Sequence, residues 1–285
     1  MNNYFLKALN QENEAPYIPV WLLRQAGRYM PEYREVRSQY KDFFEMIKKP
    51  EICKELTLQP LNAFDLDAAI TFTDILTIPD ALGLKVNFVK GKGPIFEKSL
   101  SSMDKLDLNT NEFHDKIQYV YSATSLIKEN VNVPLIGFTG SPWTLFVYMF
   151  YGQSPKDFKS IQSYISENSR DAERYLQILT DCCIGYAKRQ VQHGADCIQI
   201  FDSWAGILEN NYVDFSLKYV NQIYEALNGE VPLILYNRGK LLSTFIHESS
   251  FKAYSINSSD QIENYIDEDI TIQGNLNPDF FKKNE

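Results

Sequence analysis

Two arginines, Arg24 and Arg28, stand four residues apart in the segment RQAGR, directly after the apolar run at residues 20–23. A guanidinium binds a carboxylate through two parallel hydrogen bonds, and long charged side chains seldom follow buried residues so closely without a partner. The formal net charge of the chain is -9, so the pair forms a local cationic site in an acidic protein. The spacing predicts an anion-binding site, and pairing with Glu32 or Glu35 in a surface network is the alternative.

Further polar residues lie at or shortly after other apolar runs: Asp74, Tyr148, Asp202, Ser203, Asn237 and Arg238. If these runs are parallel strands, their carboxyl ends meet at one edge of the sheet, where barrel enzymes carry their catalytic residues. Asp74 is equally typical of a helix N-cap for the residues that follow it. Taken alone, Tyr148 is more typical of a core residue and Ser203 of a helix cap.

Seven short and nearly continuous apolar runs predict strands at residues 20–23, 68–72, 134–138, 195–201, 231–236, 253–256 and 270–273. Runs without polar alternation suit parallel strands that are covered on both faces. Residues 171–193 place apolar side chains at three- and four-residue steps and end at Gly194, which predicts an amphipathic helix. Weaker helical patterns occupy residues 50–63, 112–129 and 212–227.

Residues 85–96 interrupt this alternation and predict a β-hairpin with the turn sequence KGKG. Glycines in such a loop can also bind phosphate. A phosphate loop needs a following helix and a Lys-Ser/Thr pair, and neither is found after this turn. A plain turn is therefore favoured.

Seven β-then-α units without a low-complexity linker predict one domain, residues 1–285, built as an α/β TIM-type (β/α)8 barrel. A barrel of this kind needs eight strands to leave no sheet edge, and the sequence supplies seven. The barrel is therefore expected to be distorted and truncated after the seventh strand. The first and seventh strands would then be unpaired beside the site.

Composition narrows the class of protein. With 28 basic and 37 acidic residues, the chain lacks the extended basic face that nucleic acid or an anionic membrane requires. No apolar segment approaches the ~18 residues of a membrane span, and the amino terminus lacks a secretory signal. The irregularly spaced cysteines indicate reduced, buried thiols and a cytoplasmic location, and no metal-ligand set is predicted. These cysteines are Cys53, Cys182, Cys183 and Cys197.

Two stretches, PVWLLRQAGRYMPEYR and GFTGSPWTLFVYMFYG, resemble the two signature segments of the uroporphyrinogen decarboxylase family. Three more, ITFTDILTIPDALGLKVNFVKGKGPIF, IQIFDSWAG and IQGNLNP, resemble further blocks of that family in the same order. The resemblance runs from about Tyr4 to Asn277, which is nearly the whole chain. The ordered set of blocks makes it specific.

The resemblance implies a carboxy-lyase of tetrapyrrole biosynthesis, on the route to haem and chlorophyll, that uses no cofactor and no metal. Such an enzyme removes CO₂ from the four acetate side chains of uroporphyrinogen III and leaves methyl groups, which gives coproporphyrinogen III. Members of the family fold as a distorted (β/α)8 barrel and usually form a homodimer whose clefts face each other. Each of these properties is an expectation for this chain.

The family's functional positions map onto this sequence residue by residue. The substrate-binding residues that the resemblance implies are Arg24, Gln25, Ala26, Gly27, Arg28, Asp74, Tyr148 and Ser203. It implies catalytic roles for Asp74, which would contact pyrrole N–H groups, and for Arg24, Arg28 and Tyr148. The charges agree, because a substrate with eight carboxylates suits guanidinium groups and a cationic intermediate suits one central carboxylate.

Family members continue past the GNLNP block with another strand, a Gly-His-Gly loop and a last helix, which this sequence does not contain. The chain alone is therefore expected to be unstable or poorly active, or to need a second polypeptide. One alternative is a catalytically impaired porphyrinogen-binding or partner-completed fragment. A less favoured alternative is a zinc- or cobalamin-dependent methyltransferase of the same barrel superfamily, whose expected His-x-Cys pair is absent here.

Overall fold

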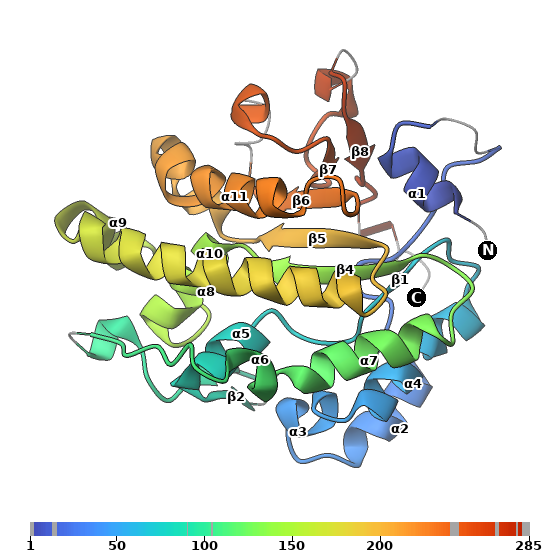
Figure 1. The fold of residues 1–285 in the computed structure, drawn as a ribbon, viewed down its shortest axis with the longest axis horizontal. Coiled ribbons are helices and arrows are strands. Elements are labelled where there is room, and N and C mark those ends of the chain that lie inside the picture. Colours follow the sequence, from blue (N-terminus) through green and yellow to red (C-terminus); the bar gives the residue numbers. More distant parts are fainter. Residues whose placement is uncertain are drawn as a thin grey trace.

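The computed structural model describes residues 3–12, 16–89, 91–103, 105–239, 245–265, 268–277 and 279–280. Its central element is a parallel sheet in the order β1-β4-β5-β6-β7-β8 (Figure 1). The strands are β1 (Ala69–Ile70), β4 (Leu135–Gly140), β5 (Cys197–Asp202), β6 (Leu233–Asn237), β7 (Ala253–Ser255) and β8 (Thr271–Gln273). β1 and β8 therefore form the two edges of this sheet.

Six of the seven predicted strands are confirmed, and all of their pairings are parallel. Every residue of β4 is buried, as are all but one of β5. This burial explains the nearly continuous apolar runs, because helices cover the outer face while the inner face packs inside the curled sheet. The expected α/β class, with the parallel strands of a TIM-type barrel, is confirmed.

The prediction of a strand at residues 20–23 was wrong. Val20 is held by Asp67, which accepts the Val20 N–H through Oδ2 at 2.8 Å and donates its own N–H to the Val20 oxygen at 2.8 Å. The Val20 and Leu23 side chains are 50% and 47% exposed. The run is apolar without being buried, and it joins no ladder in the described part of the chain.

Helices cover the outer face of the sheet. In Figure 1, α10 runs along β4 and β5, and α4 and α7 pack together at the lower edge. The α-helices are α1 (Tyr4–Leu9), α2 (Pro31–Ser38), α3 (Phe43–Ile47), α4 (Pro50–Ala63), α5 (Thr77–Pro79), α6 (Phe113–Lys116), α7 (Gln118–Lys128), α8 (Pro142–Tyr151), α9 (Lys159–Glu167), α10 (Ser169–Gln192) and α11 (Lys218–Leu227). Two π-helical segments, Asp80–Leu84 and Val213–Leu217, precede the hairpin and α11. None of the described helices has both the length and the apolar character that a membrane crossing needs.

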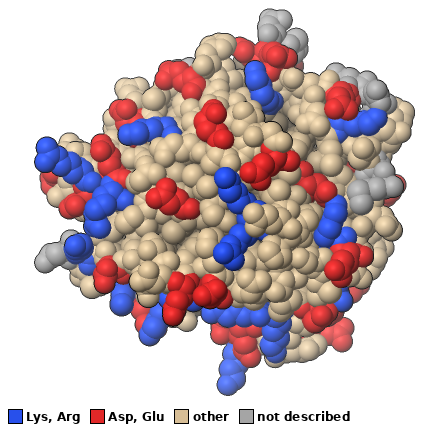
Figure 2. Space-filling view, in the orientation of Figure 1, with Lys and Arg blue, Asp and Glu red and all other residues tan. Residues whose placement is uncertain are grey.

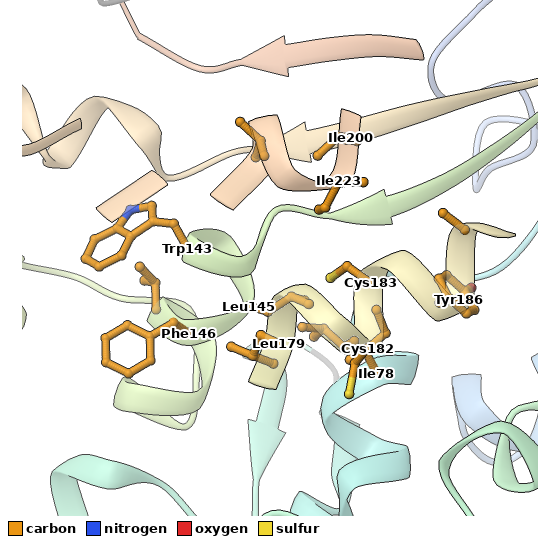
Figure 3. Packing of buried hydrophobic residues seen from close by; sticks show 14 of the residues in the cluster. Ile78, Trp143, Leu145, Phe146, Leu179, Cys182, Cys183, Tyr186, Ile200 and Ile223 are labelled. Carbon is orange, nitrogen blue, oxygen red and sulfur yellow. The ribbon is translucent and has the colours of Figure 1, made fainter. Parts of the chain in front are cut away.

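The predicted helices agree with these elements in type. The pattern at residues 50–63 is α4, and the pattern at 171–193 is α10, which ends one residue earlier than predicted. The pattern at 112–129 divides into α6 and α7, and that at 212–227 begins in π-helical form. Figure 3 shows the apolar contacts that these periodicities serve, with Leu145 of α8 near Leu179 of α10.

The predicted hairpin is confirmed as β2 (Val86–Val89) and β3 (Gly93–Phe96), which pair antiparallel. Gly93 has a φ of +82°, which a residue without Cβ adopts at no steric cost. Phe88 of β2 contacts Phe43 of α3 in a tilted arrangement, with ring centroids 5.0 Å apart. The hairpin therefore leans on α3 and brings an aromatic side chain toward the carboxyl ends of the strands.

Helix α1 closes the amino-terminal end of the curled sheet. Phe5 and Leu9 pack in one cluster with one buried residue at or next to the start of each of five strands. Those strand residues are Ala68, Ile136, Cys197, Ile234 and Ala253. The Thr271 hydroxyl donates to the Ala8 carbonyl at 2.8 Å, so α1 also contacts the β8 edge.

Phe5→Ala should lower the free energy of unfolding by about 3 kcal/mol, because it removes a buried ring and leaves a cavity between α1 and five strands. Urea unfolding followed by circular dichroism measures this difference. Phe64→Ala is the matched control, since that ring lies on the surface and its loss should change stability by less than about 1 kcal/mol. Equal effects of the two changes would contradict the sealing role of α1.

Candidate active site

A cleft of about 660 Å³ opens at the carboxyl ends of β1, β4 and β5. Small-molecule sites usually measure about 300–1,000 Å³, so the cleft has an ordinary size for a ligand. Its charged lining residues, within the described chain, are Arg24, Arg28 and Asp74. Seven lining residues are aromatic: Tyr29, Tyr33, Phe43, Phe72, Phe88, Phe138 and Phe201.

The loop that carries the two arginines is fastened to β1 through Gln25. Its Nε2 donates to the Ala68 carbonyl at 2.7 Å, and its Oε1 accepts the Ile70 N–H at 3.3 Å. The Gln25 side chain is 2% exposed, so these bonds form out of water. The amide therefore takes over backbone groups of the β1 edge that a neighbouring strand would otherwise satisfy.

The carbonyl groups of this loop are also satisfied locally. The Tyr29 hydroxyl donates to the Gln25 carbonyl, and the Met30 N–H donates to the Gly27 carbonyl at 2.9 Å. The Arg34 guanidinium donates to the carbonyls of Arg28 and Tyr29 at 2.8 and 3.1 Å. α2 then starts with Pro31 at its first position, where the missing N–H costs nothing.

Arg24 and Arg28 are both exposed at the rim of the cleft. Neither forms an ion pair with any described residue, so the alternative of a network with Glu32 or Glu35 is not seen. Ala26 and Gly27 lie between them and also line the cleft. Two unpaired guanidiniums four residues apart are suited to hold carboxylates in forked geometry.

Asp74 lies deeper in the cleft, four residues after β1 ends. Its Oδ1 accepts the Leu76 N–H at 2.9 Å, and its carbonyl accepts the Thr77 hydroxyl at 2.9 Å. The side chain therefore makes a local turn, but it is not the helix N-cap considered as an alternative, because α5 begins at Thr77 and its N-cap is Leu76. Its other oxygen, Oδ2, has no hydrogen-bond partner among the described residues, which leaves it available to a ligand in the cleft.

Burial raises the pKa of the Asp74 carboxyl from its ordinary value of 3.8 to about 6, although the Leu76 N–H and the Arg24 charge act in the opposite direction. Burial dominates because the aromatic surroundings solvate the anion poorly. The guanidinium of Arg24 is near enough to act on Asp74, yet the two form no salt bridge. The cleft thus holds positive charge at its rim and one carboxyl of raised pKa within.

The aromatic lining was not predicted from the sequence. Phe72 contacts Tyr33 and Phe43 with ring centroids 5.9 and 6.0 Å apart, which forms one wall. Phe138 of β4 and Phe201 of β5 meet edge to face at 5.5 Å and form another. Both phenylalanines lie near strand ends in otherwise apolar runs, so only their position at the strand ends distinguishes them from core residues.

Tyr148 and Ser203 do not line this cleft, in contrast to Arg24, Asp74 and the residues between Arg24 and Arg28. Tyr148 lies on α8, with its ring edge to face with Trp204 at 6.0 Å. Burial raises the pKa of Tyr148, and the nearby Asp74 charge adds to this rise. Tyr148 is therefore close enough to Asp74 to sense its charge, from the α8 side of the strand ends.

The cysteines and histidines form no second site. All four cysteines are buried and free, as expected from their spacing. The His193 Nδ1 lies 2.7 Å from the Arg189 carbonyl. In the part of the chain that the structure describes, no three His, Cys, Asp or Glu side chains gather in a way that would hold a metal ion.

Known proteins are similar to this chain in sequence along most of its length. A sequence model of the uroporphyrinogen decarboxylase family matches residues 1–285. Uroporphyrinogen decarboxylase of Francisella tularensis subsp. novicida is 40% identical over 293 residues, covering 98% of this chain and 84% of that protein. The protein of the same name from Ruthia magnifica is 41% identical over 273 residues, covering 91% of this chain and 79% of the relative.

A solved structure shares the fold. A methyltransferase from Methanosarcina mazei superposes with a TM-score of 0.77 over 95% of this chain and 81% of its own. The two sequences are 20% identical, so this likeness concerns the fold alone.

The fold and cleft define an α/β barrel-type protein with a cationic rim and an aromatic site at the carboxyl ends of its strands. Within that class, the chain belongs to the uroporphyrinogen decarboxylase family. The match to the family spans the whole chain, and relatives are about 40% identical over nearly all of it. The resemblance that the sequence motifs indicated is confirmed.

Asp74→Asn should stabilise the protein above pH 6, because the folded state raises the pKa of this carboxyl from 3.8 to about 6. The folded protein then binds a proton more tightly than the unfolded chain, so stability falls as pH rises from about 4 to about 6. At about 1.4 kcal/mol per pKa unit, the wild type loses roughly 3 kcal/mol that the asparagine variant keeps.

Urea unfolding of both proteins between pH 4 and 8 measures this difference. The exposed Asp65 provides the control, since Asp65→Asn should show a difference from wild type that does not change with pH. A parallel pH dependence of wild type and Asp74→Asn would contradict a raised pKa of the Asp74 carboxyl in the folded state.

Proposed function

We propose that this chain catalyses the decarboxylation of the four acetate side chains of uroporphyrinogen III, giving coproporphyrinogen III in tetrapyrrole biosynthesis. One observation carries the proposal: a single carboxyl of raised pKa lies in an aromatic cleft below two unpaired guanidiniums. An apolar macrocycle with charged carboxylates at its periphery needs this arrangement. Membership of the uroporphyrinogen decarboxylase family supports the same substrate.

The reaction exchanges a carboxylate for a proton. Protonation of a pyrrole carbon creates a cationic ring, which accepts the electron pair of the breaking C–C bond as CO₂ leaves. The exocyclic methylene then takes a proton and becomes the methyl group, and the ring carbon loses its added proton. Each acetate therefore consumes one net proton, and the ring passes through positively charged intermediates.

Asp74 fits the role of the group that stabilises this developing charge. Its free Oδ2 can accept hydrogen bonds from pyrrole N–H groups, and its anion then faces the cationic ring across a poorly solvated cleft. One such carboxylate can serve all four rings in turn if the macrocycle rotates between reactions. Arg24 and Arg28 would meanwhile hold carboxylates at the periphery.

The remaining site residues take supporting roles in this proposal. Ala26 and Gly27 present small surfaces between the arginines, and Gln25 both lines the cleft and fixes the loop. Tyr148 and Ser203 would contact substrate from the α8 and β5 side, outside the lining of the cleft itself. Tyr148 would act there as the fourth catalytic residue, beside the charge of Asp74.

We further propose a single cytoplasmic domain, residues 1–285, that forms a homodimer. Exposed apolar side chains near the arginine loop, including Ile18 and Val20, support self-association. Figure 2 shows basic and acidic residues interspersed over one face, which gives nucleic acid no basic surface there. Sedimentation of the purified chain measures its oligomeric state.

Formation of coproporphyrinogen III from reduced uroporphyrinogen III by the purified chain tests the function. Binding of the porphyrinogen without release of CO₂ would favour the alternative of a catalytically impaired or partner-completed fragment. The zinc-dependent methyltransferase alternative has no donor cluster to support it among the described residues, where all four cysteines are buried and free.

Asp74→Asn should lower kcat by about 10²–10³-fold, because the amide keeps the Leu76 hydrogen bond but supplies no negative charge to the cationic ring. The Kd for the porphyrinogen, measured by fluorescence quenching, should change by less than about fivefold. Asp65→Asn should leave both constants at wild-type values. Turnover near the wild-type rate in Asp74→Asn would exclude the charge role.

Arg28→Lys should lower kcat/KM by about tenfold, since an ammonium group keeps the charge but cannot bind a carboxylate through two parallel hydrogen bonds. Steady-state kinetics with uroporphyrinogen III measures the change. Arg170→Lys, on the exposed start of α10, makes the same substitution away from the cleft and should have no effect. An unchanged kcat/KM in Arg28→Lys would rule out forked recognition.

A further inference from the structure

The Asp202 side chain lies at the end of β5 and is fully buried. Its Oδ1 accepts the hydroxyls of Ser141 at 2.6 Å and Thr144 at 3.3 Å, and its Oδ2 accepts the hydroxyl of Ser216 at 2.7 Å. No described cationic side chain forms an ion pair with it. Three neutral hydroxyls and the N-terminus of α8 therefore provide the stabilisation that a buried carboxylate needs.

The hydroxyls on Asp202 belong to a larger connection between α8 and the loop after β5. The Ser141 hydroxyl caps α8 by accepting the Thr144 N–H at 2.9 Å. The Thr144 hydroxyl accepts the Trp204 N–H at 3.2 Å, and the Trp143 indole donates to the Trp204 carbonyl at 2.9 Å. Both backbone groups of Trp204 are thus fixed by α8, the helix that bears Trp143 in Figure 3.

The backbone of Asp202 also joins β5 to the end of β6. The Asp202 carbonyl accepts the Arg238 N–H at 3.2 Å, and the Arg238 carbonyl accepts the Gly206 N–H at 3.2 Å. Close by lie the buried amide of Asn237 and the buried hydroxyl of Tyr212, which acts with the other hydroxyls to lower the pKa of Asp202 against the effect of burial.

We propose that Asp202 is a positioning residue for the decarboxylation: its buried carboxylate locks α8 and the loop at residues 203–206 in one relative placement. The inference rests on the proposed function and deepens it. Tyr148 lies on α8 and Ser203 follows Asp202 directly, while the Tyr148 ring rests edge to face on Trp204. Loss of the Asp202 hydrogen bonds would therefore displace Tyr148 and Ser203 together, the two residues proposed to contact substrate from this side.

A purely stabilising role is a poor explanation for this side chain. Burial raises the pKa of Asp202 to about 6 despite its hydroxyl partners, so its ionised form is held at a cost. An apolar group of similar size commonly gives equal or greater stability at such a site. What the carboxylate adds is fixed geometry, because its two oxygens accept hydroxyls from two separate elements, the start of α8 and the π-helical segment Val213–Leu217.

The test compares Asp202→Ala and Asp202→Asn with Asp196→Asn. Asp196 lies just before the other end of β5, where it accepts the Lys128 ammonium at 2.6 Å and the Leu135 N–H at 2.7 Å. It is thus a matched carboxylate with a structural role far from the cleft. Rates are normalised to the folded fraction determined by urea unfolding.

Asp202→Ala should lower kcat by about 10²-fold, the loss expected for a misplacement of roughly 1 Å at the reacting groups. Asp202→Asn keeps an acceptor for Ser141 and should recover at least tenfold of that loss. Asp196→Asn should keep its normalised kcat within about twofold of wild type. Equal normalised kcat values in Asp202→Ala and Asp196→Asn would overturn the proposal, as would failure of Asp202→Asn to recover activity.

If Asp202→Ala does not fold, Thr144→Val removes only the hydroxyl that joins Asp202 to the Trp204 N–H. Its normalised kcat should fall by about fivefold, and an unchanged kcat would contradict the proposal. A signal independent of turnover comes from ¹⁹F NMR of the chain labelled with 5-fluorotryptophan. The chain contains three tryptophans, so the spectrum has few resonances. Trp204→Phe assigns the Trp204 resonance.

The Trp204 resonance should shift in Asp202→Ala and Thr144→Val and stay in place in Asp196→Asn. An unmoved resonance in the first two variants would overturn the positioning role. Absence of turnover in the wild type would contradict the proposed function instead, and the ¹⁹F signal would still decide whether Asp202 fixes Trp204.

Discussion

The contact on which the site depends is the pair of hydrogen bonds between the Gln25 amide and the backbone of β1. β1 is an edge of the sheet, and its free backbone groups would otherwise need water or another strand. Because a side chain fills that need, the loop beside the edge can leave extended geometry and turn its arginines outward. The placement of Arg24 and Arg28 at the rim thus follows from the hydrogen bonds that the buried Gln25 amide makes to backbone groups of the edge strand.

Two carboxyls near the strand ends, the half-buried Asp74 and the fully buried Asp202, differ in how they use their oxygens. Asp74 and Asp202 both have their pKa raised to about 6, mainly by burial. Both oxygens of Asp202 accept hydrogen bonds from hydroxyls, which fixes the start of α8 and the π-helical segment that carries Ser216. Asp74 uses one oxygen locally and keeps the other toward the cleft. Asp202 therefore organises the site, while Asp74 keeps a carboxylate oxygen that can interact with a cationic ligand.

Much of the fold could be predicted because parallel strands covered by helices leave nearly continuous apolar runs in the sequence. The same rule failed at residues 20–23, since apolarity predicts burial only where neighbouring chain supplies the cover. The motifs located Arg24, Arg28 and Asp74 around one cleft, but Phe138 and Phe201 were missed because a lining phenylalanine and a core phenylalanine look alike in sequence. Nor could sequence show that Gln25 acts on the backbone, because that contact spans more than forty residues.

The seal that α1 forms also has a consequence for how the chain reaches its fold. α1 packs on residues as late as Ala253, and the Thr271 hydroxyl binds the Ala8 carbonyl across 263 positions. During synthesis at roughly 5–20 residues per second, Phe5 and Leu9 therefore wait on the order of ten seconds or more before their partners emerge. Contacts of such long separation form slowly, and the waiting helix exposes its apolar face. The nascent chain is thus vulnerable to aggregation until its last strands are made.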